Sequence, residues 1–213
     1  EYSGSSIFSA KIVCSCCGRF FGYKVWHSTS KYKRTVWQCN HKFSNGVKCE
    51  TPHLYEDEIK KRFVEVCNRI ATDRDDFLTS CQQIVEMLSQ TTALDKKIEA
   101  QYIYLNGLTV SMQEFIKENA MEAQDEDFYK KKMAEYNAKK VDMEKVLHDL
   151  QDKRAARLSR KELLEGLIQT MSKEGILTDT FDGKLWLLLV EKATVGTDGK
   201  LTFTLRNGME IEV

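Results

Sequence analysis

The chain has 213 residues, of which 42 % are apolar and 30 % are charged, and its 32 Lys/Arg balance its 32 Asp/Glu. This size suits one large or two small domains that bury a core under a highly charged surface. No apolar run approaches the roughly 20 residues of a membrane-spanning helix, and the first residues show no signal-peptide pattern, so we expect no membrane partner.

The zero net charge conceals two parts of opposite sign. Residues 1–53 hold eight lysines and arginines but only two acidic residues, a formal charge of +6, and the rest of the chain carries −6. A zinc ion held by four thiolates would contribute about −2, which still leaves the first part basic. A basic head on an acidic stalk favours an anionic partner for the head.

The basic part of the chain predicts a small β structure. Residues 7–13, 19–26 and 36–39 have the composition of strands. The polar and basic residues 27–34 separate the last two strands. This order predicts a β-ribbon whose tip is a basic loop.

Five of the seven cysteines fall between positions 14 and 49, which indicates a metal in a reducing, cytoplasmic compartment rather than a disulfide framework. Cys14, Cys17, Cys39 and Cys49 have the spacing C-x2-C-x21-C-x9-C, which is typical of a structural zinc ribbon. Four thiolates fill a tetrahedron and leave no open position. The pattern therefore predicts one structural Zn²⁺ ion rather than a hydrolytic centre.

Other side chains compete for the metal. Cys16 could replace Cys14 or Cys17, although C-x-C makes a poorer turn, and His41 or His53 could each replace a cysteine. Cys67 and Cys81 lie at helical apolar spacing, so we expect them in the core.

Basic side chains interleaved with aromatic ones surround the ribbon loop, and two interpretations are open. The loop could be a solvated face, or it could bind DNA, because lysines and arginines neutralise phosphates and a two-stranded ribbon fits the major groove. Arg19 and Arg34 are the best candidates for reading bases, since guanidinium groups make paired contacts to guanine. The candidate DNA-binding residues are Arg19, Lys24, His27, Lys31, Lys33, Arg34 and Lys42.

Helix follows Pro52, which marks a break. Apolar residues recur at helical spacing from Leu54 and resume in a heptad-like series after residues 91–92. Asn106-Gly107 predicts a helix stop, and the capping box at residues 111–114 predicts a new start.

A 4-3 repeat in the second long helical segment predicts a coiled-coil seam with these members: Tyr129, Met133, Tyr136, Lys140, Met143, Leu147 and Leu150. We expect an antiparallel coiled-coil hairpin with arms at about 73–106 and 126–158 and a tip at 107–125. A tip at 107–110 with a longer second arm is the alternative. The seam is expected to end near residue 158, because arginines occupy its next two positions.

The hairpin could be a spacer or purely internal core. A long two-helix hairpin cannot bury all its apolar surface by itself, however, so side chains near the tip are candidates for contact with another chain. They are Tyr102, Tyr104, Leu108, Val110, Phe115, Ile116 and Phe128.

The last part of the chain returns to β structure. A capping box at residues 159–162 predicts a fresh helix to about residue 175, and a short helix should follow at 181–191. Strands at 193–195, 201–205 and 209–213 are joined at Asp198-Gly199 and Asn207-Gly208, which are hairpin signals.

The predicted fold is α+β: a small zinc β-ribbon head, a long inserted coiled-coil hairpin, and C-terminal β-hairpins that return to the head. The expected domains are 1–72, 73–158 and 159–213.

In this order the elements resemble the C-terminal part of large serine recombinases, the integrases of phages and mobile elements. The resemblance rests on residues 8–18, Trp37-Gln38-Cys39 with Cys49, the helical hairpin, residues 177–182, Leu185-Trp186 and residues 208–211. It extends over nearly the whole chain.

The resemblance implies that the zinc ribbon binds double-stranded attachment-site DNA in a bacterial host. It also implies that the coiled coil contacts the coiled coils of other subunits, controls synapsis and direction, and receives a directionality factor. The catalytic serine of that family lies in a separate domain that is not recognisable here, so we expect this chain to bind DNA and partners but to cut nothing. The rival hypothesis is a zinc-stabilised scaffold for protein partners without DNA binding.

Overall fold

The computed structural model describes residues 6–43, 49–173 and 178–213, and it confirms the α+β class. The chain divides into two compact units, one made of Glu1–Ile84 with Leu163–Val213 and the other of Val85–Glu162. Within the described ranges, no helix combines the length and the apolar character needed to cross a membrane.

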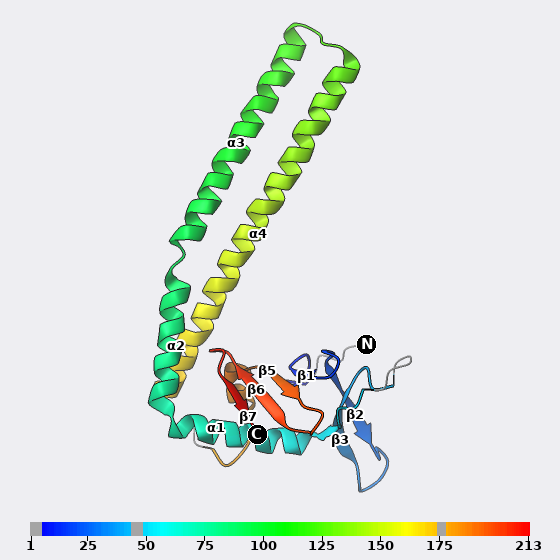
Figure 1. Ribbon diagram of the computed structural model, residues 1–213, viewed down its shortest axis with the longest axis vertical. Coiled ribbons are helices and arrows are strands. Elements are labelled where there is room, and N and C mark those ends of the chain that lie inside the picture. Colours follow the sequence, from blue (N-terminus) through cyan, green and yellow to red (C-terminus); the bar gives the residue numbers. More distant parts are fainter. Residues whose placement is uncertain (1–5, 44–48, 174–177) are drawn as a thin grey trace. The chain divides into compact units, whose positions relative to one another are not determined.

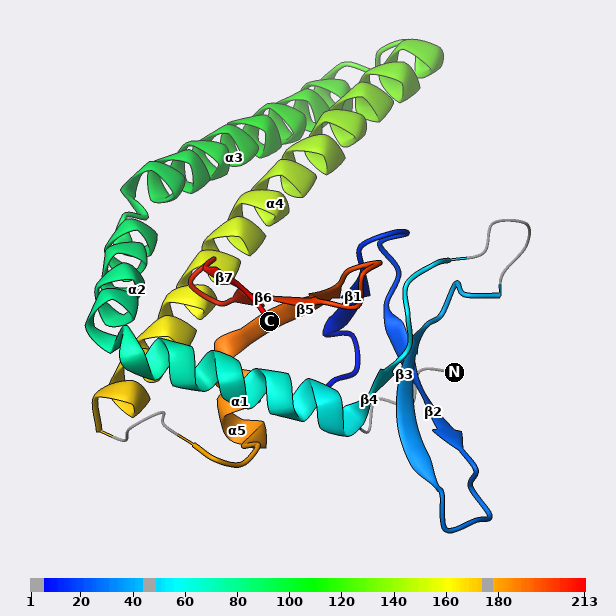
Figure 2. The same cartoon turned by 60° about the horizontal axis from the view of Figure 1, so that its bottom comes forward.

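The first unit contains a four-stranded sheet that joins the two ends of the chain. Its order is β1 (Ile12–Cys14), β5 (Val190–Val195), β6 (Leu201–Leu205) and β7 (Glu210–Glu212). Strand β1 lies beside β5 (Figure 2). The two strands pair parallel, with Ile12 opposite Ala193. The predicted return of the C-terminal strands to the head is therefore confirmed.

A second sheet in the same unit is the predicted β-ribbon with one short added strand. Its order is β2 (Phe21–Trp26), β3 (Arg34–Cys39) and β4 (Leu54–Tyr55). Strands β2 and β3 pair antiparallel along their full length, from Phe21 opposite Cys39 to Trp26 opposite Arg34. The polar residues 27–33 form the loop at the tip, as the sequence predicts.

The prediction of a strand from residue 7 is partly wrong, because residues 6–11 form turns. Phe8 lies outside the sheet in an aromatic core, where its ring is 5.8 Å from that of Trp37 and 4.7 Å from that of Trp186. Its side chain is only 1 % exposed. Burial of this large ring accounts for the departure from the extended backbone.

Two helices cover the aromatic core. Helix α1 (Glu56–Thr72) buries one face, including Phe63, and helix α5 (Gly183–Leu189) contributes Trp186. The Phe63 and Trp186 rings lie 5.2 Å apart, and the Trp186 indole donates to the Ile7 carbonyl at 3.1 Å. The carboxylate of Asp182 accepts from the first backbone N–H groups of α5 and so fixes where that helix begins.

The longest helix, α4 (Glu126–Lys173), is continuous, so the predicted new start at residues 159–162 is wrong. In the first unit Leu164, Leu167 and Met171 are fully buried, as are Phe77 and Cys81 of helix α2 (Arg74–Ser89). Burying such side chains contributes several kcal/mol, whereas a capping box contributes about 1 kcal/mol. The expected helix end near residue 175 lies outside the described residues.

The second unit is a helical hairpin of α3 (Thr92–Met121) and the adjoining part of α4, shown in Figure 1. Helix α3 runs through Asn106, Gly107 and Ser111, so the predicted helix stop, the new start and the alternative tip at 107–110 are wrong. The preferred tip at 107–125 contains the turn but begins too early, whereas the second arm begins at residue 126 as predicted. The turn lies at residues 122–125. An unbroken stripe of half-buried or buried positions explains the continuity: Leu94, Ile98, Gln101, Leu105, Leu108, Met112 and Phe115.

The 4-3 seam of α4 is present, since every predicted member from Tyr129 to Leu150 is half-buried or buried. Arg154 and Arg157 occupy the next two seam positions, just before the expected end near residue 158, and both are half-buried. Arg154 binds the Asp95 carboxylate at 2.5 Å, and Arg157 donates to the Leu88 carbonyl at 3.0 Å. The second contact satisfies a carbonyl left open where α2 ends.

Replacing Gly107 with alanine is expected to stabilise α3 by about 1 kcal/mol, because glycine is costly inside a helix and no atom lies within 4 Å of the added Cβ. Native-state hydrogen exchange at the α3 amides measures this free energy. Gly166→Ala, in the first unit, is the control and should leave α3 exchange unchanged. Faster exchange in Gly107→Ala would show that the helix breaks at residue 107.

Candidate metal centre and nucleic-acid surface

The fold brings together the four thiols selected by spacing. The Sγ atoms of Cys14, Cys17, Cys39 and Cys49 all lie within 4.8 Å of one another. The Cys14–Cys49 and Cys17–Cys39 pairs have Sγ–Sγ distances of 3.3 and 3.4 Å. Sulfurs about 2.3 Å from a tetrahedral zinc ion stand roughly 3.8 Å apart, so the cluster fits such an ion.

Local turns aim these thiols at one point. Gly18 has a positive φ of 68°, and its N–H donates to the Cys14 carbonyl at 2.9 Å, which closes the first turn. In the second turn the backbone N–H of His41 donates to Cys39 Sγ at 3.4 Å. Cys14, Cys39 and Cys49 are buried and Cys17 is half-buried.

The competing ligands lie elsewhere. Cys16 is exposed, and neither it nor any histidine belongs to the cluster found among the described residues. The ring of His53 instead lies 4.7 Å from that of Trp26. Cys67 and Cys81 are buried in helices α1 and α2, and burial raises the pKa of these thiols to about 12 and about 11.

The environment of the cluster acts unequally on its thiols. Burial raises the pKa of Cys17 and of Cys39. Burial also acts to raise the pKa of Cys49, but hydrogen bonds with Thr51, Cys14 and Cys39 together outweigh it and lower the pKa to about 6. Four sulfurs without an oxygen or nitrogen ligand favour a soft or borderline cation such as Zn²⁺. The cluster is therefore a metal-binding site consistent with zinc.

The comparisons with known proteins agree with this geometry. Residues 7–68 match the family model described as the recombinase zinc beta ribbon domain, and this stretch includes all four cysteines. Residues 7–68 are a recombinase zinc ribbon domain. A search of curated proteins and a search of solved structures gave no match. The match to the zinc ribbon family therefore indicates that the chain has a role associated with recombination.

The register of the zinc ribbon domain separates two faces. Lys24, Trp26 and Gln38 lie on one face of the β2–β3 pair, together with Arg34 opposite Trp26. The other face carries Trp37, which is 1 % exposed and packs on Phe8. Lys24, Trp26 and Arg34 of the first face are exposed, so we call it the outward face, although Val36 on the same face is buried.

The remaining basic candidates spread along the zinc ribbon domain. His27, Lys31 and Lys33 are exposed in the tip loop, and Arg19 is exposed next to the first cysteine turn. Lys42 is half-buried and donates from Nζ to the Thr51 carbonyl at 2.8 Å. A structural contact therefore already engages Lys42.

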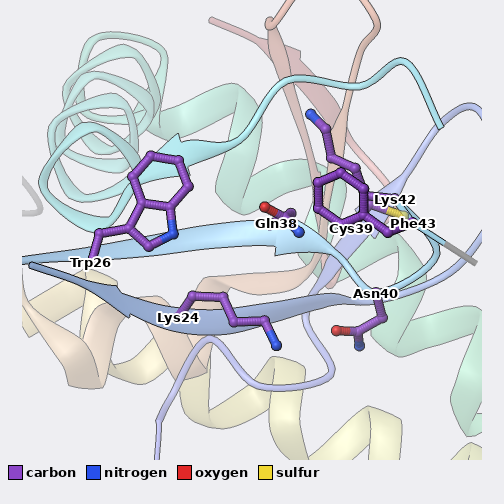
Figure 3. A pocket seen from close by; sticks show the side chains of 7 residues that line it. All are labelled: Lys24, Trp26, Gln38, Cys39, Asn40, Lys42 and Phe43. Atoms are coloured by element: carbon purple, nitrogen blue, oxygen red, sulfur yellow. The ribbon is translucent and has the colours of Figure 1, made fainter. Parts of the chain in front are cut away.

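A hollow of about 460 Å³ opens on the outward face (Figure 3). Its lining side chains include two lysines, two carboxamides and two aromatic rings but no carboxylate: Lys24, Trp26, Gln38, Cys39, Asn40, Lys42 and Phe43. Sequence reasoning missed Gln38, Asn40 and Phe43, because polar or single aromatic residues near a metal turn give no signal of their own. The strand register places Gln38 on this face, and the turn after β3 brings Asn40 and Phe43 beside it.

The Asn40 side chain approaches the backbone of Gly22 closely on the same face. A Cβ at Gly22 would lie 2.2 Å from Oδ1 of Asn40, so any larger residue would push the carboxamide aside. The Asn40 side chain therefore lies directly over the β2 backbone.

The hairpin candidates fall into two groups. Phe115 is buried and stacks on Tyr129 at 5.4 Å, and Leu108 is half-buried on the seam stripe, so both serve the hairpin itself. The exposed members are Tyr102, Tyr104, Val110, Ile116 and Phe128.

Proposed function

We propose that this chain is the DNA-binding and subunit-interaction region of a site-specific serine recombinase. The observation that supports DNA binding is the outward face of the zinc ribbon domain, where Lys24 and Arg34 flank Trp26 and the hollow has no carboxylate in its lining. This chemistry suits double-stranded DNA, and the recombinase zinc ribbon match favours attachment-site DNA in a bacterial cytoplasm as the partner.

One structural Zn²⁺ ion holds this face in place. Bound by the four thiolates, the ion would tie β1, the first turn, the end of β3 and the segment before β4 to one point. It supplies folding free energy rather than chemistry, since no coordination position remains open.

Each class of side chain has a distinct part in this proposal. Lys31 and Lys33 of the tip loop neutralise phosphates, a contact that fixes register but carries no sequence information. Arg34 and Gln38 on the outward face reach base edges, because guanidinium and carboxamide groups pair with guanine and adenine in the major groove.

The test is a titration of the zinc-loaded chain into duplex DNA selected from a random pool, beside a scrambled duplex, at 50 and 200 mM salt. We expect tighter binding to the selected duplex and a steep loss of affinity with salt. Equal, weak and salt-insensitive binding to both duplexes would exclude the DNA role and favour the protein scaffold.

The hairpin serves a second role in this proposal, as a coiled coil that contacts the coiled coils of other subunits during synapsis and that a directionality factor engages. Leu108 and Phe115 pack inside the seam of the hairpin and are not available to a partner. Large apolar side chains remain outside it, including Ile116 at 44 % and Phe128 at 53 % exposure. Exposed apolar groups close to one turn favour a protein partner.

Replacing Ile116 and Phe128 together with alanine should weaken association between subunits at least about tenfold and leave DNA affinity unchanged, since truncating contact side chains removes apolar burial. A synapsis assay with the full recombinase measures the effect. Phe115→Ala is the matched control, and it should instead loosen the hairpin in hydrogen exchange. Normal synapsis by the double variant would contradict the proposed contact.

A further inference from the structure

One hydroxyl group lies against two of the four clustered thiols. Oγ1 of Thr51 is 3.0 Å from Sγ of Cys49 and 3.2 Å from Sγ of Cys14. The Thr51 side chain is fully buried, at 0 % exposure, and is one of the few buried polar residues of the described chain. A buried hydroxyl needs a partner, and these sulfurs supply it.

The thiols differ in where their hydrogen bonds originate. Cys17, Cys39 and Cys49 each receive a backbone N–H from the residue two positions ahead, namely Arg19, His41 and Thr51. Cys14 stands at the end of β1, and its contact is with the Thr51 side chain. A side chain thus contributes for Cys14 what the backbone contributes for the other three.

A second hydrogen bond fixes the backbone of Thr51. Its carbonyl accepts from Lys42 Nζ at 2.8 Å, and Lys42 follows the turn that carries Cys39. The residue is therefore fixed at both ends, by the thiols at its hydroxyl and by Lys42 at its carbonyl. Such a fixed donor costs little further ordering when a metal binds.

We propose that Thr51 is a positioning residue of the metal centre, whose hydroxyl shares its single hydrogen between the Cys14 and Cys49 thiolates and thereby strengthens zinc binding. Four thiolates around one divalent ion leave an excess of negative charge in a buried site. Hydrogen-bond donors disperse that charge and orient the ligands, and loss of such a donor typically weakens metal affinity about 10–100-fold. This inference rests on the proposed zinc centre.

The experiment compares zinc affinity, by chelator competition, for the full chain, two Thr51 variants and one control variant. Thr51→Val keeps the shape but removes the donor, so we expect affinity to fall about 10–100-fold. Thr51→Ser keeps the hydroxyl and should bind like the wild type. Thr35→Val, a change of the same kind on β3, is the control and should leave zinc affinity unchanged.

A spectroscopic readout separates this role from a purely structural one. With Co²⁺ in place of zinc, the sulfur-to-metal charge-transfer absorption should move to longer wavelength in Thr51→Val, since a thiolate that accepts fewer hydrogen bonds gives up an electron more readily. Thr51→Ser should show the wild-type band. An unshifted band in Thr51→Val, together with zinc affinity within twofold of the wild type, would overturn the proposal.

Two further outcomes are distinct. If Thr51→Val does not fold with excess zinc, the Ser and Ala variants decide: a wild-type-like Ser variant beside a tenfold weaker Ala variant supports the role, and equal affinities overturn it. If the wild-type chain binds no zinc, the proposal of a zinc centre is refuted. Equal affinities in the wild type and Thr51→Val refute only the role of Thr51.

Discussion

Replacing Cys39 with serine is expected to abolish stoichiometric zinc binding and to unfold the zinc ribbon domain. Cys39 is buried at the end of β3, with Sγ 3.4 Å from that of Cys17, so the substitution removes one of the four sulfur ligands. Metal binding to a structural four-ligand site provides about 10–16 kcal/mol in small zinc domains, which is more than the stability of most domains. Zinc content by mass spectrometry and amide exchange over β2 and β3 measure the two effects.

Cys16→Ser is the matched control, because Cys16 lies in the first cysteine turn between Cys14 and Cys17 but is exposed and outside the cluster. It should retain the metal and the fold. Removing the metal from the wild type with a chelator should reproduce the Cys39→Ser exchange pattern. A Cys39→Ser chain with one bound zinc and normal exchange would remove Cys39 from the ligand set.

Replacing Lys33 and Arg34 together with alanine is expected to lower DNA affinity about 10- to 1000-fold at low salt. Lys33 is exposed in the tip loop, and Arg34 is exposed on the outward face with its guanidinium 5.3 Å from the Tyr55 ring centre. If each neutralises one phosphate, the plot of log affinity against log salt should lose about two units of slope. If Arg34 reads a base, preference for the selected duplex should also fall.

Lys130→Ala with Lys131→Ala is the matched control for net charge. It removes the same two charges from exposed positions of helix α4 in the other unit. A loss of affinity confined to the ribbon variant would assign the effect to the ribbon surface. Equal losses in both variants would mean that total charge, rather than this surface, governs binding.

Local corrections in the helices show where sequence reasoning fails. Gly107 and Ser159 carry local signals of a helix end and a helix start, each of which contributes about 1 kcal/mol. Both lie inside continuous helices, α3 and α4. The buried stripe that includes Leu105 and Leu108 and the core residues Leu164 and Leu167 contribute more in total, so tertiary packing overrides the local preference.

The sequence by itself determined the features that depend on short spacing and regular period. The C-x-x-C turn with Gly18, the paired strands of the ribbon and the 4-3 repeat of α4 all follow from residues close together in the chain. These patterns were readable because backbone geometry fixes the direction of each side chain in a turn, a strand or a helix.

Only the tertiary structure decided which distant segments meet. The pairing of β1 with β5, the packing of Phe8 on Trp37 and the position of Thr51 beside Cys14 each join segments far apart in the chain. The physical reason is that burial is non-directional and is summed over the whole core, so no short stretch of sequence records its outcome.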